Sequence, residues 1–153
     1  MKYVMDIYTS TYISQSITRI NKLDLNTQAK WGKMSVDQML AHLNVAYDMS
    51  FTDKYTQPNA VMRFFIKLLA KKQIVGLKPY PKNGRTAPQF VISEARNFES
   101  EKQKLIDYIE KVVALGRAHF EGFESHSFGK LTVDEWNILF EKHMEHHLTQ
   151  FGV

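Results

Sequence analysis

Two helix-starting motifs, each followed by apolar residues at helical spacing, constrain the fold of this chain more than any other feature. Ser35 is followed three residues later by Gln38, and Thr132 by Glu135. Both pairs form capping boxes, in which two side chains satisfy amide groups that the first turn of a helix leaves without a partner. The apolar residues that follow these caps are Val36, Met39, Leu40, Leu43 and Tyr47, and then Trp136, Leu139 and Phe140. We therefore predict that a helix begins at each cap, running to about residue 50 in the first case and residue 150 in the second.

The same periodicity indicates two further helices. Ile13, Ile17 and Ile20 repeat at helical spacing, which predicts a first helix over about residues 7–22. A third long helix is predicted over about residues 97–115, and Gly116 gives it a natural stop. The residues of this helix that are expected to face inward are Phe98, Leu105, Ile109 and Val112. The segment 117–131, between the last two helices, is expected to be a loop.

The segment that follows Pro58 and Asn59 has an unusual distribution of charged and apolar residues. Charged side chains repeat every four positions, at Arg63, Lys67 and Lys71, and most other positions are apolar. A helix so broadly apolar must be covered on most of its sides. We interpret it as a helix buried in the core or in a dimer interface, and the alternative is a helix that lies on a membrane surface.

Four long amphipathic helices, with one shorter helix inserted after the second, predict an all-α fold: a four-helix bundle that forms a single domain over residues 1–153. The long connection after the second helix leaves room for a crossover. Residues 76–90 in this connection contain Pro79, Pro81, Gly84 and Pro88. Loops of this length are often lids or interfaces, and a stiff, proline-rich crossover is the alternative.

The composition excludes several kinds of chemistry. The chain has no cysteine, so disulfides, thiolate metal sites and cysteine nucleophiles are excluded, and any metal must be bound through nitrogen or oxygen. The net charge of +4 is small and the basic residues are scattered, so nucleic-acid binding is not expected. Charged residues interrupt the apolar stretch 61–77, so no membrane span is predicted, and the segment Met1–Ser10 lacks the apolar core of a signal peptide. We therefore expect a cytoplasmic protein.

Three of the six histidines fall within five residues of the last predicted helix, at His143, His146 and His147. His143 and His147 are four residues apart on the face that carries the core residues, and this spacing can bring two imidazoles to one metal ion. His42 lies on the inner flank of the second helix, so it is expected to point into the same interior. We predict that His42, His143 and His147 hold one divalent metal ion and leave a position open for water or substrate, with His146 just outside the ligands. The alternative is that these histidines are ordinary core residues.

What surrounds the histidine pair also limits the chemistry. In a zincin metalloprotease a glutamate directly follows the first histidine and serves as the base, but here Met144 follows His143. Glu141 and Glu145 are expected to point to the opposite face of the helix. The paired glutamate and histidine motifs of di-iron bundles are missing as well. Neither a zinc protease nor a dinuclear site is therefore expected, and no general base can be assigned.

Two regions of the sequence are similar to a known family. The segments Trp31–Ser35 and Gln38–Leu43 resemble the start of the second helix in the DinB-like superfamily. Near the C-terminus, Phe128–Thr132, Lys142–His143 and His146–Gly152 resemble an uncharacterised bacterial branch of that superfamily. The match in order and spacing covers most of the chain, and its C-terminal part is the most specific.

This resemblance implies a four-helix bundle with a three-histidine metal site and frequent dimerisation. It favours His143 and His147 over His146 as the ligands from the last helix. The metals it implies are nickel or zinc, with iron as a further candidate. Some DinB-like proteins transfer low-molecular-weight thiols to small molecules, and others isomerise a thiol adduct.

Two functional hypotheses follow. In the first, the protein is a metal-dependent enzyme, a thiol transferase or a hydrolase, whose substrate is a low-molecular-weight thiol or an electrophile. The proline-rich loop 76–90 and the phenylalanine-containing segment 117–131 are then candidate walls for the substrate. In the second, the protein is a non-catalytic binding or structural bundle, and the metal site is structural or vestigial. A homodimer is expected in both cases.

Overall fold

Residues 4–153 fold into five α-helices and a very small sheet. The computed structural model describes residues 4–153; residues 1–3, which begin both the predicted domain and the segment Met1–Ser10, lie outside the described residues. The helices are α1 (Ser10–Ile20), α2 (Val36–Phe51), α3 (Ala60–Val75), α4 (Phe98–Phe120) and α5 (Val133–Gln150). A short 3-10 helix, η1 (Pro88–Phe90), precedes α4, and the strands are β1 (Glu124–Ser125) and β2 (Gly129–Lys130).

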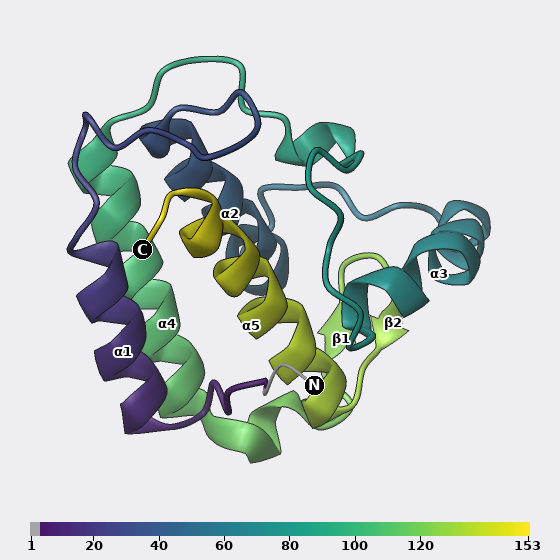
Figure 1. The fold of residues 1–153 in the computed structure, drawn as a ribbon. Helices are drawn as coiled ribbons and strands as arrows, with labels where there is room; N and C mark the ends of the chain where they lie inside the picture. Colours follow the sequence, from purple (N-terminus) through teal and green to yellow (C-terminus); the bar gives the residue numbers. More distant parts are fainter. Residues whose placement is uncertain (1–3) are drawn as a thin grey trace.

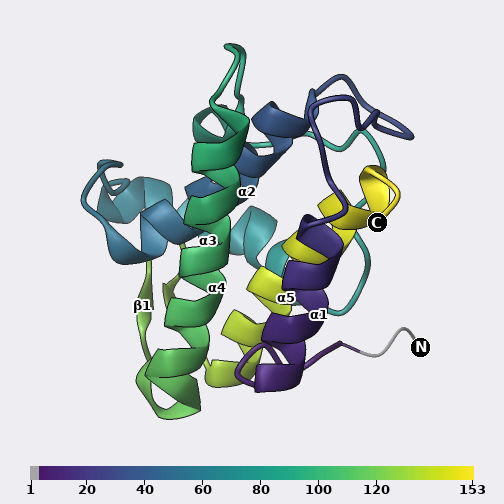
Figure 2. The ribbon, with the colours of Figure 1, turned by 90° about the vertical axis from the view of Figure 1, so that its left-hand side faces the viewer.

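Four of the helices, α1, α2, α4 and α5, surround one hydrophobic core (Figure 1). The most extensive contact joins α2 to α4, and α5 packs against α2, α3 and α4. Seen from the side, α1 runs along α5 and α4 (Figure 2). The prediction of an all-α helical bundle is therefore confirmed.

The predicted caps form where the sequence places them. The backbone N–H of Thr132 donates to Glu135, and the N–H of Glu135 donates back to the Thr132 hydroxyl, at 3.0 and 3.2 Å. At α2, the N–H of Ser35 donates to Gln38 at 3.1 Å. These reciprocal bonds satisfy amides that the helix itself cannot use, which fixes where α2 and α5 begin.

The core is built from the apolar stripes that the sequence indicates, joined by a column of aromatic rings. Tyr47 on α2 stacks on Phe140 of α5, with ring centroids 4.5 Å apart, and Phe140 stacks on Trp136 at 5.3 Å. The predicted inward residues of α2 and α4 are all buried: Val36, Met39, Leu40, Leu43 and Tyr47, with Phe98, Leu105, Ile109 and Val112. These contacts hold α2 and α5 side by side, which determines the position of the histidines that both helices carry.

The segment 117–131 is more ordered than the loop that the sequence predicts. The expected break occurs at Gly116, whose φ of +71° is outside the helical range, but one more helical turn follows it to Phe120. Then β1 and β2 pair as an antiparallel hairpin, and the N–H of Leu131 donates to the carbonyl of Phe123. Burial of Phe120 and Leu131 explains the order. Strands of two residues are too short to give a detectable alternation.

The inserted helix α3 differs most from expectation. It has 16 residues, the same length as α2, so it is not short. It lies apart from the bundle and packs on α5 (Figure 1). Burial in the core is wrong, because six of its large apolar side chains are exposed. The cause is that two members of its charged stripe face the protein: Arg63 pairs with Glu124 and Lys71 with Glu135, while Lys67 is exposed.

The long connection after α3 crosses the bundle and reaches α2 through η1. Lys142 of α5 holds the beginning of this connection, because its buried ammonium group donates to the backbone carbonyls of Gln73, Gly76 and Lys78. Within residues 4–153, no helix is both long enough and apolar enough to cross a membrane.

Candidate metal centre

The structure brings together His42 from the middle of α2 and His143 and His147 from successive turns of α5. Each of these residues offers one nitrogen, and the three nitrogens lie within 4.8 Å of one another. The ring centroid of His42 is 4.9 Å from that of His143 and 4.5 Å from that of His147. Among residues 4–153 this is the one group of three potential ligands that meets this criterion. These three histidines could therefore hold a metal ion.

The distance between the nitrogens of His42 and His143 suits a small divalent cation. The Nε2 atoms of His42 and His143 are 2.9 Å apart. With zinc–nitrogen bonds of about 2.0–2.1 Å, two ligands of a tetrahedral ion lie about 3.3 Å apart and two adjacent ligands of an octahedral ion about 2.9 Å apart. Binding therefore requires movements of a few tenths of an ångström at most between these two atoms.

Hydrogen bonds to the opposite nitrogen orient two of the rings. Nδ1 of His42 is 2.8 Å from the carbonyl oxygen of Phe90. A carbonyl can only accept, so Nδ1 carries the proton and Nε2 keeps its lone pair. Nε2 of His143 faces that lone pair, so without a metal it must donate its own proton to His42. A bound cation would take the place of this proton.

His147 is the second ring oriented in this way, through Gln150. The Nε2 amide of Gln150 donates to the carbonyl of Trp31 at 2.7 Å, and its Oε1 is 2.7 Å from Nδ1 of His147. Because the Trp31 carbonyl can only accept, the amide nitrogen must face it and the amide oxygen must face His147. His147 therefore donates from Nδ1, and its Nε2 remains available to a metal. Partners of this kind orient the histidine ligands of metal sites.

The close approach of Gln150 explains a glycine in the connection before α2. Gly32 has a φ of +84°, and a Cβ atom at this position would lie 2.6 Å from the amide nitrogen of Gln150. A side chain here is therefore disfavoured both by the backbone conformation and by the contact.

Burial keeps all three imidazoles neutral, which is the form that binds a metal. It lowers the pKa of His42 and of His143, and it lowers the pKa of His147 to about 3. Neighbouring histidines, His146 among them, lower each pKa further, because a second positive charge would be repelled. At neutral pH no proton has to be displaced from a charged ring before metal binds.

His146 lies outside this group of three, at its rim. Its ring contacts those of Trp31 and Tyr80 edge-on, with centroids 5.8 and 5.7 Å away. It is next to His147 in the chain, but successive residues of a helix point about 100° apart. The expectation that His146 stands just outside the ligand cluster agrees with this position.

The loop 76–90 and η1 cover the cluster. The ring of Phe90 lies 5.4 Å from that of His42 and 5.8 Å from that of His143, and Tyr80 lies 6.4 Å from His143. Phe90 thus acts twice, since its carbonyl orients His42 while its ring covers the site. No residue pattern predicts this contact, because any residue type can supply a backbone carbonyl.

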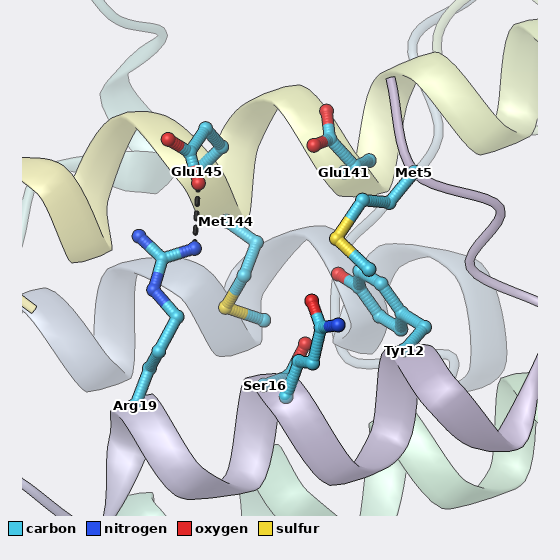
Figure 3. A pocket seen from close by; sticks show the side chains of 8 residues that line it. Met5, Tyr12, Ser16, Arg19, Glu141, Met144 and Glu145 are labelled. Carbon is cyan, nitrogen blue, oxygen red and sulfur yellow. Dashed lines mark hydrogen bonds and ion pairs between the residues drawn. The ribbon is translucent and has the colours of Figure 1, made fainter. Parts of the chain in front are cut away.

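The two glutamates next to the histidines on α5 face away from them, as predicted. Figure 3 shows Glu141 and Glu145 on the side of α5 that faces α1, and Glu145 pairs with Arg19 at 2.6 Å. Met5, Tyr12 and Ser16 line the same space, which has a volume of about 20 Å³, enough for one water molecule. These carboxylates therefore serve the contact between α1 and α5.

The fold and the cluster together define a class of protein: an all-α bundle with three histidines gathered between two of its helices. Comparison with protein families then identifies the family to which the chain belongs. A family model described as "Protein of unknown function (DUF1569)" matches residues 8–152, so the chain belongs to this family. No curated protein and no solved structure matches the chain.

Proposed function

We propose that this protein is a DinB-like metalloprotein with one divalent metal ion bound by His42, His143 and His147. The observation that carries the proposal is the convergence of nitrogens from three neutral imidazoles, two of which are oriented by the hydrogen bonds that they donate to Phe90 and Gln150. An all-nitrogen donor set suits nickel, zinc or iron better than magnesium or calcium, which prefer oxygen. The DinB-like resemblance supports nickel or zinc in particular.

We propose that the centre is catalytic and acts on a low-molecular-weight thiol or an electrophile, as a transferase or a hydrolase. A bound metal would supply Lewis acidity, which lowers the pKa of a coordinated thiol or water. The nearest glutamates in the sequence face α1, and Glu145 pairs there with Arg19, so they are directed away from this centre. This favours a thiol, which ionises at a pKa of about 8.5 and needs less help from a base than water does.

The alternative is a metal that only stabilises the bundle. The observation in its favour is the cover over the cluster, where the rings of Phe90 and Tyr80 stand against the histidines. A structural metal at this site would join α2 to α5, and no substrate would have to reach it. In that case the function of the protein lies in a binding surface.

Elemental analysis of the untagged protein tests the metal centre. We expect about one equivalent of nickel, zinc or iron per chain, and its loss in His42→Ala and His143→Ala. His119→Ala is the matched control, because His119 is an exposed histidine outside the cluster and its loss should leave the metal content unchanged. Absence of metal from the wild-type protein after reloading would refute the proposal.

Removal of the metal distinguishes a catalytic role of the metal from a structural one. An apoprotein that stays folded, with a circular dichroism spectrum like that of the loaded form, supports the catalytic proposal, and a collapse on chelation supports the structural one. Turnover of a thiol and electrophile panel by the loaded protein, lost in His143→Ala, would then identify the reaction.

We also propose a homodimeric, cytoplasmic protein. The DinB-like resemblance supports the dimer, and the cysteine-free composition suits a reducing compartment. Mass measurement in solution and localisation of the tagged chain test these two points.

A further inference from the structure

One face of α3 is apolar and uncovered. This α3 face consists of six side chains that are 51–78% exposed: Val61, Met62, Phe64, Phe65, Leu68 and Leu69. Single exposed apolar residues are normal on protein surfaces, but a contiguous group of this size marks an interaction site.

The orientation of α3 shows that this face is not an accident of a poorly packed helix. Arg63 and Lys71 point toward the protein and pair with Glu124 and Glu135 at 2.6 and 2.7 Å. The helix is thus held with Arg63 and Lys71 inward and its aromatic and leucine side chains outward. An ordinary surface helix has the reverse arrangement.

We infer that the α3 face is the dimer interface of this protein and that its occupant is the α3 face of a second copy. The inference rests on the proposed homodimer and is independent of the metal centre. Three properties of the face support it: its ridges, its charge and its area.

The apolar side chains form ridges suited to another helix. Phe64 and Leu68 are four residues apart, and so are Phe65 and Leu69, so the face has two parallel rows separated by a groove. Rows of this kind interdigitate when two helices pack. In a twofold dimer one self-complementary face is sufficient, because each copy uses the same residues.

Two of the four basic residues of α3 are paired within the chain, which weakens the case for a lipid surface. A helix that lies on a membrane places lysines and arginines beside its apolar face, where they meet anionic headgroups. Here Arg63 and Lys71 are engaged with glutamates of the same chain. Their pairing also lowers the positive charge that two like faces would bring together. Lys67 and Lys72 remain exposed.

The area approaches that of a stable interface. At the exposed fractions of the α3 face, these six side chains present roughly 600 Å² of surface, against the ~800 Å² that each partner buries in a standard interface. The helix stands at the edge of the molecule, apart from α1, α2 and α4, so a second copy can reach it (Figure 1).

The test compares the solution mass of the wild-type protein with that of Phe65→Glu and of the double variant Phe65→Glu/Leu68→Glu. We expect the wild type at twice the 17.8 kDa of the chain at micromolar concentration and both variants as monomers, with dimerisation weakened at least about 30-fold. Val91→Glu is the matched control, since Val91 is 62% exposed outside α3 and its variant should stay dimeric. Unchanged circular dichroism and metal content would show that the variants fold.

Because the chain has no cysteine, single cysteines at the exposed positions of the α3 face give a second readout. The position nearest the twofold axis should form a disulfide-linked dimer on oxidation, and Val91→Cys should not. A monomeric wild type would overturn both the proposed dimer and this interface. A dimer that persists in the double variant would overturn the interface alone. Binding to phosphatidylserine vesicles that is lost in Phe65→Glu would assign the face to a membrane instead.

Discussion

The role of Gln150 gives the most discriminating test of how the histidine cluster is organised. Its side chain is buried and makes two hydrogen bonds of 2.7 Å, one with Nδ1 of His147 and one with the carbonyl of Trp31. In Gln150→Ala both are lost, and His147 is no longer held with Nε2 toward the cluster. Loss of such a partner typically weakens metal binding 10–100-fold, which is about 1.4–2.7 kcal/mol at 25 °C.

Gln150→Glu is the matched variant, because it changes only one of these two bonds. The carboxylate still accepts from Nδ1 of His147, but it cannot donate to the carbonyl of Trp31. We expect metal affinity to be retained or raised, since a carboxylate partner increases the basicity of a histidine ligand. The stability of the metal-free protein should fall, by about 1–3 kcal/mol, because two acceptors then face each other in a buried place.

Competition with a chromophoric chelator, at fixed pH and ionic strength, measures the affinity of each variant for zinc and for nickel. Urea unfolding of the metal-free proteins measures stability separately. The reasoning predicts that the two substitutions differ in affinity although both lower stability. If Gln150→Ala binds metal within twofold of the wild type, or if both variants lose affinity equally, Gln150 does not orient His147 and only supports the fold.

The remaining predictions concern the ligands, the pH dependence and one glycine. His143→Ala should lower metal affinity at least about 1,000-fold, because one of three ligands is removed, whereas His146→Ala should change it less than about 10-fold. Isothermal titration calorimetry measures both affinities, and the opposite ranking would exclude His42, His143 and His147 as the ligand set. Burial lowers the pKa of His147 from 6.5 to about 3, so as the pH falls the unfolded chain binds a proton at this residue before the folded protein does. The contribution of neutral, buried His147 to stability is therefore complete above pH 6.5 and is lost progressively below it. For the metal-free protein between pH 6 and 4, His147→Gln should therefore reduce the pH slope of the unfolding free energy by about 1.4 kcal/mol per pH unit, and equal slopes would show that His147 is not buried in neutral form. Gly32→Ala should cost more stability than Gly122→Ala, by about 1–2 kcal/mol in thermal melts, because both glycines have positive φ but only the first would place a Cβ against another side chain. Equal costs would mean that backbone strain is the whole effect.

Local signals in the sequence were sufficient to locate the elements that carry the histidines. The capping boxes at Ser35 and Thr132 and the stripes behind them involve residues three or four apart, and such patterns depend little on the rest of the chain. The helical spacing of His143 and His147 on the core side of α5 placed both in the interior. His42 required only that its flank of α2 should face α5, which follows from bundle packing.

What the sequence did not predict depends on partners that are distant along the chain. The orientation of α3 is an example, because periodicity separates a charged face from an apolar one but does not say which faces inward. Glu124 and Glu135, which pair with Arg63 and Lys71, lie far away in β1 and α5. The contact of Phe90 with His42 spans 48 residues and uses a main-chain oxygen.

The double role of Phe90 has a kinetic consequence. The residue that covers the cluster also supplies the oxygen that orients His42. A movement of η1 that exposes the cluster would also break the hydrogen bond that orients His42, so in the proposed metal centre opening the site and loosening a bound ion would be the same event. The residence time of a bound ion would then follow the opening rate of this segment. Copper would outcompete nickel or zinc at equilibrium, but a closed site would keep the ion that was present when it closed. The metal found in the purified protein would thus be the one that was available in the cell during folding, because slow exchange in the closed form would prevent its replacement.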